Sequence, residues 1–256
     1  MKDAVAIVTG ASQGIGRATA LRLARDFSAI TLVARNADHL NEAAAEVRAQ
    51  GAEDLVLALD VSEPRSAVVI VDDTLKRFGR IDALLNIAGA VPQVDLFDMS
   101  DAAWDSGMAL KFHGARRLAL HAWDALKATK GSVVFMSGTA AQIPKAAFAA
   151  VGAINAAIVA LAKAFADRGL TDEVQVNSVL PGPVMTDRRK SYLENWAPVH
   201  NVTIEQAGNG FLARAGIERY GKPEEIAELM AFLVSPAARW MTGSAIRMDG
   251  GEVSAL

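Results

Sequence analysis

Short apolar runs alternate with amphipathic stretches along the whole chain of 256 residues. The apolar runs, several of them rich in Val and Ile, predict buried strands near residues 5–8, 30–33, 55–59, 81–87, 132–136, 174–179 and 243–248. Between them, apolar positions three or four residues apart predict helices near 16–25, 37–49, 64–78, 100–127, 146–168 and 223–234. This alternation predicts an α/β fold, a doubly wound parallel sheet of about seven strands with helices on both faces.

Length and composition favour one domain. No repeat or linker interrupts the pattern, so residues 1–256 are expected to form a single domain, and 52% hydrophobic residues suffice for a large core. A net charge of -3 predicts no nucleic-acid or membrane partner, and the basic run 188–190 is interpreted as a solvated loop. The absence of cysteine and of metal-ligand spacing argues against disulfides and metals. No leader-like segment or long apolar run is seen, so a cytoplasmic location is expected.

A glycine-rich loop follows the first predicted strand and precedes a helix. Gly10 permits a tight turn, Gly14 leaves room for a pyrophosphate, and Gly16 allows the helix to pack closely on the strand. The N-terminus of the helix adds free N–H groups and partial positive charge. The loop therefore predicts a Rossmann-type dinucleotide site that also includes Ser12, Gln13 and Ile15.

Residues after the next strands refine this site. About 20 residues beyond such a loop an acid favours NAD, whereas an arginine accommodates the 2′-phosphate of NADP. Arg35 stands there without an acid, so NADP(H) is favoured over NAD(H). The ends of the third and fourth strands are expected to approach the adenine and the rest of the cofactor with Asp60, Val61, Asn86, Ala88 and Gly89.

Several motifs, in order and over nearly the whole chain, resemble the short-chain dehydrogenase/reductase family. They are TGASQGIG (9–16), Asp60, NIAG (86–89), NSVLPGPVMTD (177–187), RYGKPEEIA (219–227) and TGSAIRMDGGEV (242–253). The resemblance implies that Thr186 meets the nicotinamide, within a segment that includes Pro181, Gly182 and Val184. It also implies that residues 188–217 form a mobile substrate loop, and that the chain forms a homodimer or homotetramer.

The resemblance implies four catalytic residues, and here all four positions hold other residues. Val151 stands where the family has a proton-exchanging tyrosine, and Asn155 where it has the lysine that lowers the pKa of that tyrosine. Gly138 replaces the serine that polarises the carbonyl, and Lys111 replaces the asparagine of the central helix. The cofactor half of the site is thus expected to be complete and the catalytic half altered.

Two of these changes are open to a joint explanation. Lys111 and Asn155 resemble the exchanged lysine and asparagine of ketoreductase domains in polyketide synthases, although independent change at both positions is the alternative. Thr139, beyond the strand, is the expected substitute for the missing serine. Other candidate proton donors are Lys111 itself, His113, Lys145, Tyr192 and His200, whereas His39 and His121 are expected at the surface.

Two functions remain open. The first is an NAD(P)-dependent oxidoreductase with non-standard proton transfer, acting between a carbonyl and an alcohol or on an activated C=C bond. The second is a catalytically silent protein that binds NADP(H) or another small molecule, including an inactive subunit beside an active family member. The aromatic residues Tyr192, Trp196 and Phe211 suggest a ligand with an apolar part, although covering the core explains them equally well.

Overall fold

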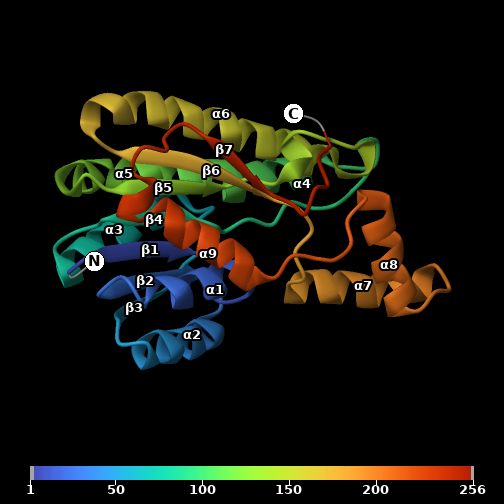
Figure 1. Ribbon diagram of the computed structural model, residues 1–256, viewed down its shortest axis with the longest axis horizontal. Coiled ribbons are helices and arrows are strands. Elements are labelled where there is room, and N and C mark those ends of the chain that lie inside the picture. Colours follow the sequence, from blue (N-terminus) through green and yellow to red (C-terminus); the bar gives the residue numbers. More distant parts are fainter. Residues whose placement is uncertain (1–2, 255–256) are drawn as a thin grey trace.

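The computed structural model describes residues 3–254, and these contain a seven-stranded parallel sheet between two layers of helices (Figure 1). The strand order is β3-β2-β1-β4-β5-β6-β7, as expected for a doubly wound sheet. The predicted fold class is therefore confirmed. The strands are β1 (Val5–Thr9), β2 (Ala29–Ala34), β3 (Glu53–Ala58), β4 (Ala83–Asn86), β5 (Ser132–Met136), β6 (Gln175–Pro181) and β7 (Ala245–Met248).

Alternate side chains of the strands pack into two separate hydrophobic cores, one on each face of the sheet. Along β1, Ala6 and Val8 pack into one core and Ile7 into the other, because neighbouring side chains of a strand point to opposite faces. The first core is covered by α1 (Gly14–Leu23), α2 (Ala37–Ala49) and α9 (Pro223–Leu233). The second is covered by α3 (Pro64–Phe78), α5 (Gly114–Thr129) and α6 (Ala149–Asp172).

Helix α6 is unusually apolar. The segment Ala146–Asp172 has a mean hydropathy of 1.9 over its most apolar window, which by length and composition alone is enough to cross a membrane. Sequence inspection misses this because charged residues interrupt the run. In the fold, Ile154, Ile158 and Ala162 of this helix are almost completely buried, so packing inside the protein accounts for part of its composition.

The central helix is not the single predicted helix 100–127. It divides into α4 (Asp101–Gly107), a π-helical segment (Met108–His113) and α5. A glycine stands at each end of the π-helical segment, where neighbouring residues approach closely. A Cβ on Gly107 would lie 3.0 Å from Ile154 Cδ1, and a Cβ on Gly114 would lie 2.7 Å from the carbonyl oxygen of Val61. Apolar periodicity does not reveal this widening, which often marks functional sites.

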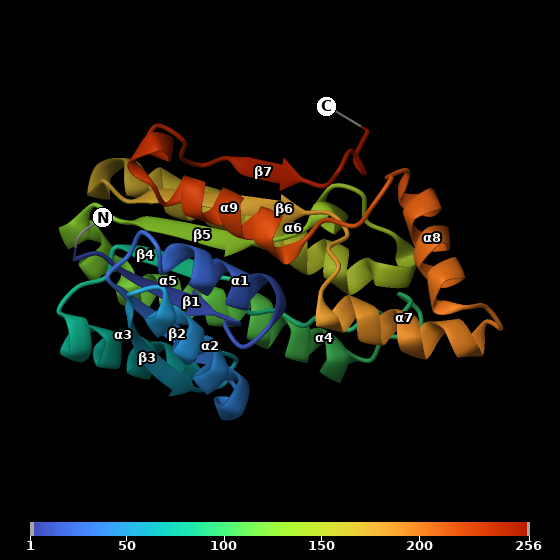
Figure 2. The same cartoon turned by 60° about the horizontal axis from the view of Figure 1, so that its bottom comes forward.

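The predicted loop 188–217 is largely helical. It forms α7 (Asp187–Val199) and α8 (Ile204–Ala215), which lie beyond the carboxyl ends of the strands (Figure 2). Their apolar side chains make a small core of their own, in which the Trp196 and Phe211 rings are 5.3 Å apart. The remaining short helices are 3₁₀ turns at Thr139–Ala141, Ala146–Phe148 and Pro236–Ala238.

Candidate functional site

A cleft of about 1190 Å³ opens where the strand order reverses, at the carboxyl ends of β1 and β4. Thr9 ties these two strands together, since its hydroxyl accepts from the N–H groups of Ile87 and Ala88 at 3.0 Å each. Ligands of doubly wound sheets bind at such a reversal, because the loops on either side diverge and leave a crevice. The fold therefore places a large cleft at the predicted dinucleotide site.

The glycine loop has the geometry that a dinucleotide requires. Gly10 and Gly14 have φ of 71° and 54°, which favour glycine, and a Cβ on Gly16 would lie 2.0 Å from the carbonyl oxygen of Gly10. The helix that follows has no side-chain cap at Gln13, so its first N–H groups are free to bind an anion. The residues present thus fit the pyrophosphate of a dinucleotide.

A basic group lies at the end of β2. Arg35 is 71% exposed and lines the cleft, and its guanidinium is 4.0 Å from the Asp60 carboxylate. The other oxygen of Asp60 accepts from the backbone N–H of Ser62 at 2.9 Å, which fixes the carboxylate. His39 is exposed, as expected, but it also lines the cleft, a position that sequence reasoning did not assign to it.

Of the sixteen residues predicted to bind the cofactor, the structure places all but Asn86 in the lining of this cleft. Asn86 is only 4% exposed, and neither of its side-chain polar atoms has a protein partner. The expectation that the chain at the end of β4 approaches the cofactor stays a prediction for Asn86. The residues that do line it are Gly10, Ser12, Gln13, Gly14, Ile15, Gly16, Arg35, Asp60, Val61, Ala88, Gly89, Pro181, Gly182, Val184 and Thr186.

Three of the four positions at which the family resemblance implies other residues are in contact with one another. Lys111 Nζ donates to Asn155 Oδ1 and, at 3.2 Å, to the carbonyl oxygen of Ser137. A Cβ on Gly138 would lie 2.9 Å from Asn155 Nδ2, so the amide fills the space beside the glycine. The φ of Gly138 is 164°, an extended conformation open to any residue, so space and not backbone strain selects glycine. Val151 lines the same cleft.

The environment of Lys111 weakens its hold on a proton. Burial, and then the positive charge of Arg188, lower the pKa of Lys111 from its usual value to about 8. Both of its hydrogen-bond acceptors are neutral, so neither offsets this effect as a carboxylate would. An ammonium group with such a pKa exchanges protons readily near neutral pH.

The two hydroxyls beside Gly138 are already bonded. Thr139 Oγ1 donates to Glu252 Oε2 at 2.6 Å, and Thr139 is not among the residues that line the cleft. Ser137 does line it, but its Oγ donates to the backbone carbonyl of Asn155 at 2.8 Å. The expectation that Thr139 replaces the missing serine is therefore not supported by this geometry.

Comparison with known proteins agrees with the fold. A profile of the family described as "Enoyl-(Acyl carrier protein) reductase" matches residues 10–252. The chain belongs to the short-chain dehydrogenase/reductase family. The family profile covers the glycine loop, the residues around Lys111 and the helices beyond the sheet.

Relatives of this short-chain dehydrogenase/reductase reduce varied compounds, according to their names. "Tropinone reductase-like 3" of Erythroxylum coca is 31% identical, over 98% of this chain and 94% of the relative. "Probable tetrahydroxynaphthalene reductase" of Zymoseptoria tritici is 29% identical, over 96% and 93%. L-sorbose reductase of Gluconobacter frateurii, solved with NADPH and L-sorbose, superimposes with a TM-score of 0.94 at 29% identity, over 99% and 97%. Levodione reductase gives 0.93 at 26%, over the full length of both chains.

Among the other candidate proton donors, only Tyr192 lines the cleft. His200 stacks on Trp196 at 3.6 Å and bonds its backbone, and Lys145 lies in a separate shallow pocket. Burial, followed by the charges of Arg116 and Arg117, lowers the pKa of His113, whose Nδ1 is buried without a protein partner. Lys111 and Tyr192 are therefore the titratable candidates that face the cleft.

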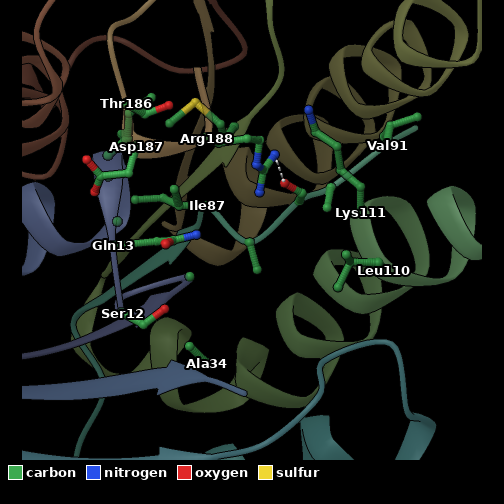
Figure 3. Close-up of a pocket in the computed structure, with 18 of the residues that line it drawn as sticks. Ser12, Gln13, Ala34, Ile87, Val91, Leu110, Lys111, Thr186, Asp187 and Arg188 are labelled. Atoms are coloured by element: carbon green, nitrogen blue, oxygen red, sulfur yellow. Dashed lines mark hydrogen bonds between the residues drawn. The ribbon is translucent and has the colours of Figure 1, made fainter. Parts of the chain in front are cut away.

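The basic run 188–190 is not a uniformly solvated loop. Arg188 and Arg189 line the cleft, whereas Lys190 does not and pairs with Asp187 at 3.2 Å, although both Arg188 and Lys190 are exposed. Arg188 Nη1 donates to the carbonyl oxygen of Gly89 at 2.9 Å, as the dashed line in Figure 3 shows. The sequence alone gave no sign of this, because the contact depends on how α7 lies against the end of β4.

Proposed function

We propose that this protein is an NADP(H)-dependent reductase of carbonyl compounds or activated alkenes, in which Lys111 supplies the proton. The observation that carries the proposal is the set of hydrogen bonds around Lys111 Nζ. Two of its donor positions are taken by neutral oxygens, of Asn155 and Ser137, and the third is left for a group in the cleft.

The proton balance of the step follows from this arrangement. When bound, the reduced nicotinamide supplies the hydride. The ammonium of Lys111 donates its third proton to the developing oxyanion of a carbonyl, or to the corresponding carbon of an alkene. The neutral amine that remains still donates to Asn155 and Ser137, so both hydrogen bonds persist through the step. Solvent in the open cleft returns the proton.

The preference for NADP(H) rests on Arg35. Its guanidinium is largely exposed, and its distance of 4.0 Å from Asp60 leaves most of its donors available. A guanidinium binds a phosphate through parallel charge-assisted hydrogen bonds, and NAD lacks the 2′-phosphate that would receive them. A titration with NADPH and NADH tests this preference without any turnover.

Activity is tested by oxidation of NADPH with a panel of ketones, 2-oxo acids and enones. We expect turnover that falls as the pH rises through about 8, because the protonated form of Lys111 is the donor. Lys111→Met is expected to lower kcat at least roughly a hundredfold, within the usual range for a lost general acid. A control variant, Lys190→Met, removes an exposed cation of α7 and should leave kcat unchanged.

The same measurements distinguish the alternative function. Tight binding of NADPH without turnover of any compound in the panel would favour a silent binding protein or an inactive partner subunit. The structural observation in favour of this alternative is Val151, whose apolar side chain lines the cleft and cannot donate a proton. Turnover that is insensitive to Lys111→Met would assign the proton to another group, with Tyr192 next to be replaced.

A further inference from the structure

Two cations converge on one glycine at the edge of the cleft. The stem of Lys111 packs on Gly89, since a Cβ built there would lie 3.0 Å from Lys111 Cδ. Arg188 bonds the carbonyl oxygen of the same glycine at 2.9 Å. Lys111 comes from the π-helical segment and Arg188 from α7, and both side chains are seen in the cleft in Figure 3.

Neither of these cations is balanced by an acid. Within residues 3–254, the hydrogen bonds of Lys111 and Arg188 go to carbonyl and amide oxygens, and no carboxylate lies within ion-pair distance of either. Asp187, the acid next to Arg188 in the chain, pairs with Lys190 instead. The charge of Arg188 contributes, after burial, to the lowered pKa of Lys111, so the two groups repel each other. An anion between them would relieve this repulsion.

We propose that Arg188, together with Lys111, binds the carboxylate of a 2-oxo acid, which makes this the substrate class. This inference rests on the proposed function. A planar guanidinium matches a carboxylate through two parallel hydrogen bonds. A 2-oxo acid carries its carbonyl next to the carboxylate, so a substrate held by Arg188 would present that oxygen within the cleft that Lys111 also lines. Val91, Leu110 and Val151 line the same cleft and accommodate an apolar remainder of the substrate.

The cofactor is the other source of an anion for Arg188. Its phosphates, however, have their own cradle in the glycine loop, the N-terminus of α1 and Arg35. Arg188 contacts Gly89, the residue against which Lys111 packs, and the charge of Arg35 also acts on it, since burial and then Arg35 lower the pKa of Arg188. We therefore assign Arg188 to the substrate, and the experiment separates the two sources.

A binding experiment needs no turnover. The full-length protein is titrated with benzoate and with its neutral counterpart benzamide, by calorimetry, with and without NADP⁺. We expect benzoate to bind at least tenfold more tightly than benzamide, with NADP⁺ present as well as absent. Arg188→Met should abolish this preference, whereas Lys190→Met, which removes an equal charge from the same helix, should keep it.

A second arm uses a substrate pair that differs in one charge. The kcat/KM for phenylglyoxylate is compared with that for its methyl ester, using NADPH. Arg188→Met should reduce the acid-to-ester ratio at least tenfold through a higher KM for the acid, and leave the Kd of NADPH within twofold.

The outcomes separate the two proposals. Equal binding of benzoate and benzamide overturns the anion site, whether or not the protein reduces anything. Loss of benzoate binding on addition of NADP⁺, or a tenfold weaker Kd of NADPH in Arg188→Met, assigns Arg188 to the cofactor and also overturns it. Selective benzoate binding without NADPH turnover supports the anion site and contradicts the reductase function.

Discussion

The side-chain amide of Asn155 occupies the space that a Cβ at Gly138 would need, at 2.9 Å from Nδ2. The amide is held there because its oxygen accepts from Lys111. The glycine, the asparagine and the lysine are thus parts of one arrangement. Replacing any one of them alone should disturb the other two.

Gly138→Ala should destabilise the protein by about 1–3 kcal/mol, the usual cost of overpacking a filled site. In an Asn155→Ala background the same change should cost less than about 1 kcal/mol, because the amide is gone. Urea unfolding of the native protein, the two single variants and the double variant measures the cost of Gly138→Ala in each background. Equal costs in the two backgrounds would show that position 138 is independent of the amide.

Asn155→Asp should shift the pH profile of reduction upward. A carboxylate beside Lys111 stabilises its ammonium form, so the pKa of Lys111, about 8 in the native protein, should rise by about one unit or more. The alkaline limb of kcat/KM against pH reports this change. Because Lys111 of the variant stays protonated to higher pH, the variant should keep a larger fraction of its activity above pH 8 than the native protein does. An unmoved limb would assign the titration to another group.

Arg35→Ala should weaken NADPH binding roughly tenfold or more, consistent with the loss of charge-assisted hydrogen bonds. The Kd of NADH should change much less, because it offers no 2′-phosphate. Quenching of protein fluorescence during titration measures both constants. The matched control is Arg48→Ala, which removes an arginine of α2 that pairs with Asp54 of β3. Equal losses for both cofactors would remove the basis for the NADP(H) preference.

Asp172 should contribute to stability above its usual pKa and cease to do so in acid. Its carboxylate is 2% exposed and accepts from Trp123, Lys127 and Arg168 at 2.7–2.9 Å. These donors hold the pKa of Asp172 well below its usual range. The charged form is therefore favoured by folding, and its stabilisation is lost as the pH falls below about 4.

Thermal unfolding of Asp172→Asn tests this sign. The variant should have a lower Tm than the native protein at pH 7, and the difference should narrow between pH 4 and the acid limit. Glu173→Gln, at the exposed neighbour that pairs with Lys130, should have little effect at either pH. A constant difference across the pH range would mean that packing, and not ionisation, is responsible.

The sequence predicted the fold well because each strand and most helices carry a local signal. The runs that became β1, β2 and β5 are continuous and apolar, and the glycine loop has a fixed spacing. Alignment of the motifs singled out Lys111 and Asn155 as a possible exchanged pair, and the structure joins their side chains by a hydrogen bond.

The parts that sequence reasoning missed depend on contacts between distant segments. Thr139 bonds Glu252, and Arg188 bonds Gly89, and neither pairing leaves a periodic or local pattern. The burial of the Asn86 side chain, with neither polar atom bonded, likewise has no signal in the sequence. The helical nature of 188–217 was missed because the family resemblance suggested a loop there.

The π-helical turn at Met108–His113 lies between α4 and α5. A π-helical turn holds one residue more than an α-helical turn over nearly the same rotation, so deletion of one residue there, which would restore a regular α-helix, would leave α4 and α5 in their present alignment. Leu118 and Leu126 fix the buried face of α5 against the sheet. The extra residue therefore affects the residues within the turn, Lys111 among them, and its deletion would turn Lys111 relative to the cleft while both flanking helices keep their buried faces.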